Sequence, residues 1–253
     1  MSEILLNVED GVAVITLNRP EAKNAVNQAL AQAMAKSLDE IEHRDDVRVV
    51  ILTGAGGSFC AGMDLKAFVA GEKVVTDDKG FAGFVQAFVS KPVIAAIEGY
   101  ALAGGCELAL ACDLIVAADN AKFGLPEVKR GLAAGAGGLL RLPRQLPYRV
   151  AMELALTGDF ADAPRMYELG LINRVVEKGG AMAGALELGR TIAANAPMST
   201  RATKTVIAQQ PDWSQDEMFD RQNEIIAPVM ASEDAIEGSR AFAEKREPVW
   251  KNR

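Results

Sequence analysis

The sequence predicts an α/β core followed by a helical C-terminal region. Up to about residue 195, short apolar and β-branched segments alternate with amphipathic ones, which is the pattern of strands that alternate with helices. Glycine clusters follow several of the predicted strands, and helical periodicity dominates after residue 195. We therefore expect a core at residues 1–195 and a helical region at residues 196–253.

The elements of the N-terminal part follow from periodicity. Val12–Leu17 is a β-branched run that ends at Arg19-Pro20, so it predicts a strand. Apolar residues at helical spacing predict a helix from Asn27 to about Glu42. Val47–Thr53 is apolar almost throughout and runs into the glycine-rich loop Gly54–Gly57, which indicates a buried strand.

The centre of the chain repeats this order of strand and glycine loop. Val93–Ile97 predicts a strand, Glu98–Ala103 a loop, and Gly104–Cys112 the first turns of a helix of small residues. Leu114–Ala117 predicts another buried strand, and the glycine cluster Gly135–Gly138 follows it.

From about Arg144 the pattern becomes helical. One later segment, Ile172–Val176, predicts a strand. The predicted helices are Val150–Leu156, Ala161–Leu169, Ala181–Ala194, Thr200–Ala208, Glu217–Val229 and Ser232–Glu244.

Composition argues against several classes of protein. The chain has 253 residues, with 27 Lys and Arg against 34 Asp and Glu, and its net charge of −7 disfavours nucleic acid as a partner. The most apolar stretch, Val93–Cys112, is interrupted by Glu98 and Glu107, so we expect no membrane span. Met1–Asp10 has no basic segment of the kind that begins a secretory signal, so we expect a cytoplasmic protein.

The cysteines and the single histidine limit the catalytic mechanisms and metal sites that the sequence supports. Cys60, Cys106 and Cys112 form an odd set without CxxC spacing, which favours reduced thiols over disulfides or a zinc site. A thiol nucleophile at Cys60 or Cys106 is the alternative, but His43 is a poor partner because it lies in a charged turn. Carboxylates are therefore the expected proton carriers, and no metal site is expected.

The glycine clusters do not match phosphate-binding loops. No GxxxxGK[ST] motif occurs, and Gly54-Ala55-Gly56 is followed three residues on by Phe59 instead of glycine. Glycines permit tight turns and close helix packing, and they also leave backbone N–H groups open to an oxygen with developing negative charge. Two such loops could supply one donor each.

Three glutamates lie within or close to apolar segments. Glu107 lies in the first turn of a predicted helix, whose N-terminus favours an ionised carboxylate. Glu127 follows Pro126, between a buried strand and a glycine cluster. Two glutamates near one pocket could divide acid and base roles, whereas a helix-terminal and a surface position are the structural alternatives. Glu98 lies in a turn beside Gly99, which favours a solvated or backbone-bonded role.

Five motifs in this order resemble the crotonase, or enoyl-CoA hydratase/isomerase, superfamily, and the resemblance covers Val14 to about Trp250. The motifs are Asn18–Ala25 (NRPEAKNA), Ser58–Lys66 (SFCAGMDLK), Pro92–Glu107 (PVIAAIEGYALAGGCE), Phe123–Glu127 (FGLPE) and Gly135–Gly138 (GAGG).

The resemblance implies a crotonase-like spiral of ββα units with a helical C-terminal oligomerisation region. It implies that the backbone N–H groups of Met63 and Gly104 form an oxyanion hole. It also implies a homotrimer or a dimer of trimers, with Phe242 and Lys245 reaching the CoA of a neighbouring subunit. The substrate and CoA contacts that it implies are Lys23, Ala25, Ala61, Met63, Asp64, Leu65, Lys66 and Gly104.

The implied reaction is syn addition of water to a 2-trans-enoyl-CoA, which gives a 3-hydroxyacyl-CoA. Glu107 and Glu127 fall on positions that resemble the hydratase pair, with Glu107 as the base that orients water and Glu127 as the acid. Coenzyme A would be part of the substrate, and no further cofactor is expected.

The sequence is also compatible with other functions. An isomerase of the same superfamily would use Glu127 with little need for Glu107. Leu139–Pro147 resembles the carnitinyl-CoA dehydratase branch, and Ala67–Ser90, where the acyl pocket would vary, matches no motif. A non-catalytic CoA-binding protein is the alternative from another class. Some relatives bind RNA, which the net charge disfavours here.

Overall fold

A six-stranded sheet forms the centre of the computed structural model, which describes residues 2–253. β1 is antiparallel to β2, and the other neighbouring strands are parallel. In spatial order the strands are β1 (Ile4–Glu9), β2 (Val12–Leu17), β3 (Val49–Gly54), β6 (Val93–Ile97), β8 (Leu114–Ala118) and β11 (Arg174–Val176).

Shorter strands form a second layer beside this sheet. In it β7 pairs with β9 in parallel and β9 pairs with β10 in the opposite direction. The strands of this sheet are β10 (Ala161–Asp162), β9 (Lys122–Gly124) and β7 (Tyr100–Leu102), and a separate pair consists of β4 (Val75–Thr76) and β5 (Gly80–Phe81). A single bridge between Cys60 and Ala101 joins the loop after β3 to β7.

Helices cover both faces of the large sheet and continue beyond it. The α-helices are α1 (Gln28–Glu42), α2 (Leu65–Val69), α3 (Gly104–Ala111), α4 (Gly138–Gln145), α5 (Tyr148–Thr157), α6 (Ala163–Glu168), α7 (Ala181–Ala193), α8 (Pro197–Gln209), α9 (Met218–Met230) and α10 (Glu233–Glu244). Short 3-10 helices are η1 (Pro20–Ala22), η2 (Ala55–Gly57), η3 (Pro126–Arg130) and η4 (Gln210–Asp212).

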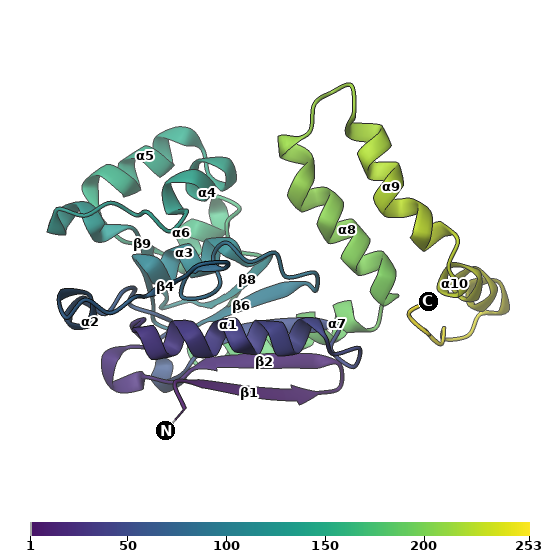
Figure 1. Cartoon of the computed structure of the whole chain (residues 1–253), viewed down its shortest axis with the longest axis horizontal. Helices are drawn as coiled ribbons and strands as arrows, with labels where there is room; N and C mark the ends of the chain where they lie inside the picture. The colour runs from purple at the N-terminus through teal and green to yellow at the C-terminus, as the bar shows by residue number, and fades with distance from the viewer. Residues whose placement is uncertain (1) are drawn as a thin grey trace.

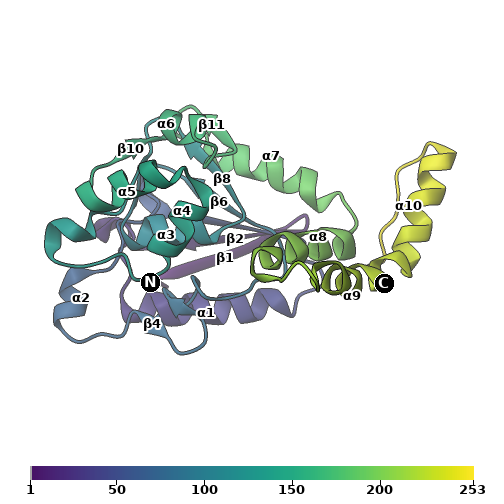
Figure 2. The ribbon, with the colours of Figure 1, turned by 90° about the horizontal axis from the view of Figure 1, so that it is seen from above.

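α1 and α7 lie on opposite faces of the large sheet, as Figure 2 shows. Leu30, Met34 and Leu38 of α1 belong to the larger core, together with Val50 and Leu52 of β3. The other face of the sheet packs against Ala185 and Ala193 of α7. Because β3 and β6 are covered on both faces, their sequences are almost continuously apolar.

The helices α8, α9 and α10 extend away from the sheet (Figure 1). α8 is fastened to the core by Lys204, whose ammonium group pairs with Asp113 at 2.7 Å and donates to the Lys91 carbonyl at 2.9 Å. Large apolar side chains on these helices are exposed, among them Phe219, Met230 and Phe242. Among residues 2–253, no helix is long and apolar enough to cross a bilayer.

Most elements match the predictions, and three differ. Glu98–Ala103 is not wholly a loop, because Tyr100–Leu102 forms β7 by pairing with the distant strand β9. The segment that predicted a helix from Ala161 begins instead with the two residues of β10, and α6 starts at Ala163. Helical structure begins at Gly138, before Arg144, because α4 accommodates Pro143 within it. In addition, the strands β1, β4, β5 and β9 and the helix α2 were not predicted.

Candidate active site

Two backbone loops that were predicted to work together are in contact. Gly62 lies in the loop after β3, and an added Cβ atom there would be 2.8 Å from the Ala103 Cβ and 3.1 Å from the Gly104 nitrogen. The φ angle of Gly62 is +100°, so glycine is favoured at this position by both conformation and space. The close approach places Met63 next to the start of α3.

The backbone N–H groups of Met63 and Gly104 are free to bind an oxygen. Within residues 2–253 neither N–H donates to an acceptor of the protein. By contrast, the neighbouring Gly62 N–H points to the Cys60 sulfur and the Asp64 N–H donates to the Val26 carbonyl at 2.9 Å. Gly104 is the first residue of α3, where an N–H has no acceptor within the helix.

Ala103 adopts an unusual conformation just before this helix. Its φ is +51° and its ψ is −127°, which is costly for a residue with a Cβ atom. The conformation is held because the Ala103 N–H donates to the Gly124 carbonyl at 2.9 Å. The turn therefore keeps the Gly104 N–H beside the Gly62–Met63 backbone, in an arrangement suited to an oxyanion hole.

A buried polar network fixes the first loop. The Asn24 side chain is fully buried, and its amide donates to the Ser58 carbonyl at 2.7 Å while its oxygen accepts from the Arg19 N–H at 2.9 Å. The Arg19 guanidinium pairs with Asp64 at 3.1 Å. The first sequence motif is thus tied to both ends of the loop that carries Met63.

The predicted CoA-contact residues lie together along this network. The Ala61 N–H donates to the Lys23 carbonyl at 3.0 Å, and Ala25 is buried beside them. Lys23 is exposed, and its ammonium group lies 4.7 Å from the centre of the Tyr100 ring. Asp64 caps α2, whose first residues, Leu65 and Lys66, are exposed.

Glu107 is buried on α3 and accepts a hydrogen bond from a second helix. Its Oε1 accepts from the backbone N–H of Gly138, the first residue of α4, at 2.8 Å. A Cβ atom on Gly138 would lie 3.0 Å from that oxygen, so a glycine allows the close approach. Burial raises the pKa of Glu107, whereas N–H groups of Gly138 and Ala136 and the charge of Arg141 oppose this rise.

Glu127 lies on η3 in a different environment. Its Oε2 is buried and has no hydrogen-bond partner within residues 2–253. Burial raises the pKa of Glu127 to about 7, and the negative charge of Glu107 acts in the same direction. One carboxylate is therefore held by backbone donors, and the other tends to keep its proton near neutral pH, as a base and an acid require.

Other candidates from the sequence do not join this site. Glu98 is backbone-bonded, as expected, and accepts from Gly179 and Ala181 at the start of α7. His43 is exposed at the end of α1. Burial raises the pKa of Cys60 and of Cys106 to about 12, which disfavours thiolate nucleophiles.

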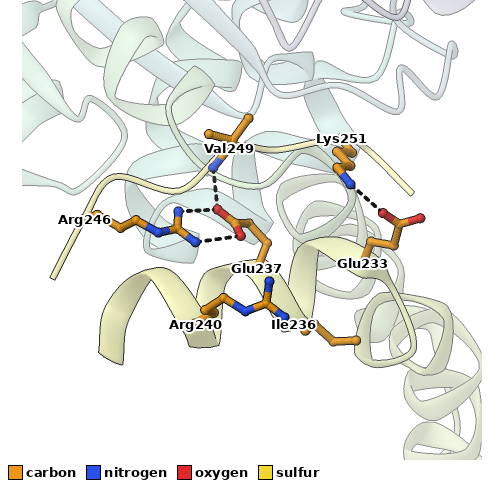
Figure 3. A pocket seen from close by; sticks show the side chains of 7 residues that line it. All are labelled: Glu233, Ile236, Glu237, Arg240, Arg246, Val249 and Lys251. Atoms are coloured by element: carbon orange, nitrogen blue, oxygen red, sulfur yellow. Dashed lines mark hydrogen bonds and ion pairs between the residues drawn. The ribbon is translucent and has the colours of Figure 1, made fainter. Parts of the chain in front are cut away.

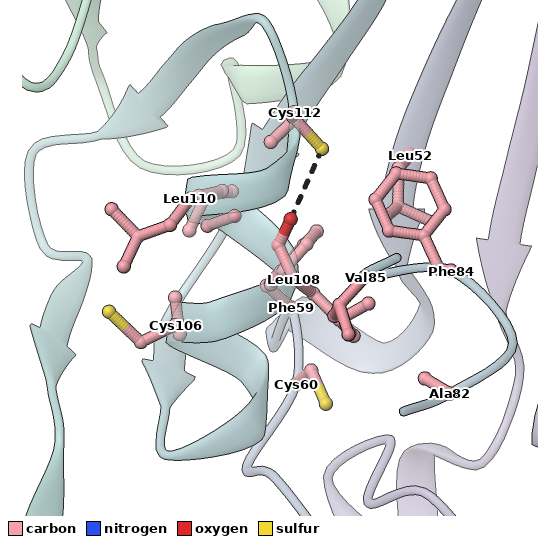
Figure 4. Packing of buried hydrophobic residues seen from close by; sticks show 14 of the residues in the cluster. Leu52, Phe59, Cys60, Ala82, Phe84, Val85, Cys106, Leu108, Leu110 and Cys112 are labelled. Carbon is pink, nitrogen blue, oxygen red and sulfur yellow. Dashed lines mark hydrogen bonds between the residues drawn. The ribbon is translucent and has the colours of Figure 1, made fainter. Parts of the chain in front are cut away.

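The third cysteine, Cys112, is buried as well. Its thiol donates to the Leu108 carbonyl at 3.3 Å (Figure 4). All three cysteines are thus buried residues of the core, and the Cys60 thiol also donates to the Asn24 carbonyl at 3.2 Å.

A pocket of about 480 Å³ lies at the C-terminal end of the chain, between α10 and the tail that follows it (Figure 3). Its charged side chains are mostly paired with one another, as in the Arg246–Glu237 and Lys251–Glu233 contacts at 2.6 and 2.9 Å. It contains neither of the two candidate glutamates. We therefore do not assign the reaction to it.

Sequence reasoning missed two contributors to the site. Gly138 was noticed only as part of a glycine cluster, although its N–H binds Glu107. The positive φ of Ala103 had no sequence signal, because alanine is not a residue that favours this conformation. The glycine cluster Gly135–Gly138 was the sequence signal that could have indicated the contact with Glu107, since glycines often occur where another group approaches the backbone closely.

Comparison with known proteins gives consistent matches along the chain. The family model described as enoyl-CoA hydratase/isomerase matches residues 7–253. The enoyl-CoA hydratase EchA19 of Mycobacterium tuberculosis is 41% identical over 95% of this chain and 93% of its own length. A carnitinyl-CoA dehydratase of Citrobacter koseri is 42% identical, and the match covers both chains completely.

Solved structures agree closely. The crystal structure of an enoyl-CoA hydratase from Mycobacterium tuberculosis has a TM-score of 0.98 and 54% identity, and the match covers both chains completely. A carnitinyl-CoA hydratase from Mycobacterium avium has a TM-score of 0.80 and 46% identity, again with complete coverage of both chains.

Proposed function

The chain belongs to the enoyl-CoA hydratase/isomerase family, and we propose that Glu107 and Glu127 together carry its reaction. The fold is crotonase-like, and the enzyme is an enoyl-CoA hydratase, a carbon–oxygen lyase. It adds water syn across the 2-trans double bond of an enoyl-CoA thioester. The observation that carries the assignment of the residues is a contrast between the two side chains. Glu107 accepts a hydrogen bond from backbone, whereas the Oε2 of Glu127 has no hydrogen-bond partner within residues 2–253 and burial raises the pKa of Glu127 to about 7.

The two glutamates perform the addition in complementary steps. The ionised Glu107 takes one proton from water while the water oxygen bonds to C3, and the protonated Glu127 delivers its proton to C2. The Met63 and Gly104 N–H groups stabilise the thioester oxygen while it carries enolate charge, and each such donor is typically worth about 10²- to 10³-fold in rate. Transfer of a proton from Glu107 back to Glu127 through solvent restores the starting state.

The thioester would lie along the paired segments that carry Lys23 and Met63. The hydrogen bond from the Ala61 N–H to the Lys23 carbonyl and the bridge between Val26 and Met63 support this proposal, because they join the segments that contain Lys23, Ala25, Ala61 and Met63–Lys66. In this proposal CoA belongs to the substrate, and the addition of water needs neither a metal nor another cofactor. Carboxylates transfer the protons, and backbone amides stabilise the thioester oxygen.

We propose a homotrimer, or a dimer of trimers, for the assembled enzyme. The exposed apolar side chains on α8, α9 and α10 support this, because an extended helical arm with such residues is suited to packing against another copy. Phe242 is exposed on α10, in keeping with the proposed reach of Phe242 and Lys245 toward a neighbouring CoA. A cytoplasmic location is the corresponding proposal for the compartment.

The activity is tested by following the ultraviolet absorbance of crotonyl-CoA with purified protein. We expect the enoyl absorbance to fall with the wild type, and Glu107→Gln and Glu127→Gln each to lower kcat by about 10²- to 10⁴-fold. Retained turnover in Glu107→Gln would contradict its role as base and favour an isomerase. CoA binding without any turnover, and without dependence on either glutamate, would indicate a binding protein.

A carnitinyl-CoA dehydratase is the second candidate. The full-length match at 42% identity favours it, as does the resemblance of the segment Leu139–Pro147 to that branch. The same two carboxylates would then remove water from carnitinyl-CoA. Comparing kcat/KM for crotonyl-CoA hydration and carnitinyl-CoA dehydration decides between the two substrates, and the substrate with the higher value is the preferred one.

A further inference from the structure

Arg141 is a half-buried cation that the proposed reaction does not use directly. It lies on α4, one turn after the residue whose N–H binds Glu107. Within residues 2–253 its guanidinium forms no ion pair within 4.0 Å, although half-buried arginines are usually paired. Burial of a guanidinium without a paired carboxylate is costly, so a role for Arg141 is expected.

The guanidinium is fixed by backbone on two sides. Its Nη2 donates to the carbonyl of Val85, in the segment that follows β5. Its Nη1 lies beside Gly137, where an added Cβ atom would be 2.2 Å away. Gly137 has a φ of +100° and directly precedes Gly138, so the guanidinium is folded back over the start of α4.

The segment that contains Val85 also contacts the proposed oxyanion hole. The ring of Phe81, four residues earlier, lies against Gly104, where an added Cβ atom would be 2.5 Å from two ring carbons. Val85 is connected to Phe81 by a backbone hydrogen bond of 3.2 Å. Arg141 therefore links the helix that binds Glu107 to the segment that packs on the oxyanion donor.

We infer that Arg141 is a positioning residue for Glu107: it holds the start of α4 so that the Gly138 N–H stays on the carboxylate, and it keeps a fixed positive charge facing that carboxylate. This inference rests on the proposed role of Glu107 as base. An ionised base is needed before water is attacked, and a nearby cation favours the ionised form. The absence of a direct ion pair leaves the carboxylate able to accept a proton.

The other groups that act on these two residues are few. Glu107 is influenced by the N–H groups of Gly138 and Ala136 and by Arg141, and its own charge acts on Glu127 and Cys106. Arg141 itself is influenced by Glu107 and by Cys112, and burial is the main cause that lowers its pKa. Arg141 is thus the one side-chain cation among the groups acting on Glu107.

The test is the pH dependence of kcat/KM for crotonyl-CoA hydration in Arg141→Gln and Arg141→Lys. In Arg141→Gln we expect the ratio of activity at pH 6 to activity at pH 8 to fall about two- to five-fold below the wild-type ratio, because Glu107 then ionises only at higher pH. Arg141→Lys retains the charge and should largely restore the wild-type ratio. Equal losses at every pH in Arg141→Gln would overturn the inference, because they indicate a structural role alone.

Arg144→Gln is the matched control. Arg144 lies on the same helix and is exposed, and within residues 2–253 its one ion pair is with Asp212 at 3.6 Å. Its removal takes the same charge from α4 without changing what faces Glu107, so the pH ratio should stay at the wild-type value. A shift as large as that of Arg141→Gln would overturn the inference, because the effect would then come from general charge.

A second variant covers the case in which Arg141→Gln does not fold, as judged by circular dichroism. Gly137→Ala keeps every charge but places a methyl group where Nη1 lies, so the guanidinium must move. We expect its pH ratio to fall in the same direction as that of Arg141→Gln. A folded Gly137→Ala variant with the wild-type ratio would overturn the inference.

A measurement without turnover separates this inference from the proposed function. The carboxyl carbon of Glu107 is followed by ¹³C NMR during a pH titration in the Glu127→Gln background, which removes coupling between the two glutamates. Arg141→Gln should raise the titration midpoint of Glu107, and an unchanged midpoint would overturn the inference. If wild-type protein does not hydrate crotonyl-CoA, the proposed function fails while this titration still decides the role of Arg141.

Discussion

Glu107 and Glu127 are the same type of residue with different contacts, and these contacts set their protonation states. Glu107 accepts a hydrogen bond from the start of α4, whose partial positive charge favours a carboxylate. Glu127 has a buried oxygen, Oε2, that accepts no hydrogen bond from the part of the chain that the structure describes. At the scale of single residues, the division of labour between acid and base therefore comes from two or three backbone N–H groups.

The first prediction at this scale concerns pH. Glu107 must be ionised, so kcat/KM should rise as pH rises through its pKa. Glu127 must be protonated, so kcat/KM should fall above about pH 7, since burial raises its pKa to about 7. The profile measured with crotonyl-CoA should be bell-shaped, and a rate that keeps rising to pH 9 would show that Glu127 is not the acid.

The second prediction concerns the space around Glu107. Gly138→Ala places a methyl group 3.0 Å from Oε1 and Cγ of Glu107, so the carboxylate must shift. We expect kcat to fall by about 10²-fold because small displacements of a catalytic group are costly, while KM changes little. Gly189→Ala on α7 is the control, since its new Cβ would make only ordinary contacts of 3.6 Å or more.

At the scale of elements, the C-terminus of α1 contacts the buried ammonium group of Lys91. Lys91 is 2% exposed, and its ammonium group donates to the carbonyls of Ile41 and Arg44 at the C-terminus of α1. The last carbonyls of a helix lack partners within the helix, so this side chain satisfies two of the groups there. Its own carbonyl accepts from Lys204, which joins α1, β6 and α8.

Lys91→Met should therefore destabilise the fold. Removing the ammonium group takes a charge-assisted hydrogen bond from each of the Ile41 and Arg44 carbonyls, which costs about 2–4 kcal/mol of unfolding free energy. Urea denaturation measures the change. Lys36→Met, at an exposed position on the same helix, should change the free energy by less than about 0.5 kcal/mol, and equal effects of the two variants would contradict this account.

At the scale of the whole molecule, the arm formed by α8–α10 has no counterpart in the same chain that covers it. Phe242 is 88% exposed and Met230 is 73% exposed. Burying such side chains against another copy would stabilise the assembly, because it removes apolar surface from water that a single chain leaves exposed. Assembly would then also decide what lies near the substrate, because Phe242 and Lys245 lie on or beside α10.

Sedimentation at equilibrium tests this proposal. We expect the mass of three or six chains, because the exposed apolar side chains of the arm would be covered by other copies. Replacement of Phe219 and Phe242 by Asp should shift the protein toward smaller species. A wild-type mass of one chain at micromolar concentration would contradict the trimer.

The sequence alone determined the elements whose side chains carry a regular pattern, together with the residues of the candidate site. Val93–Ile97 was predicted because a strand buried on both faces must be apolar along its length. Glu107 was selected because a carboxylate within apolar sequence needs a reason, and Glu127 because it lies between a buried strand and a glycine cluster. The resemblance placed both in one site. The N-terminal strand β1, the short strands β4, β5, β7 and β9 and the short helix α2 were not predicted in this way.

Only the tertiary structure decided what those residues contact. The hydrogen bond from Gly138 to Glu107 joins positions 31 apart, and that from Arg141 to Val85 joins positions 56 apart. β7 is a strand only because β9 lies beside it. Local patterns record which face of an element is buried, but the partner of a polar group depends on how distant segments pack, and that packing sets the protonation states on which the reaction depends.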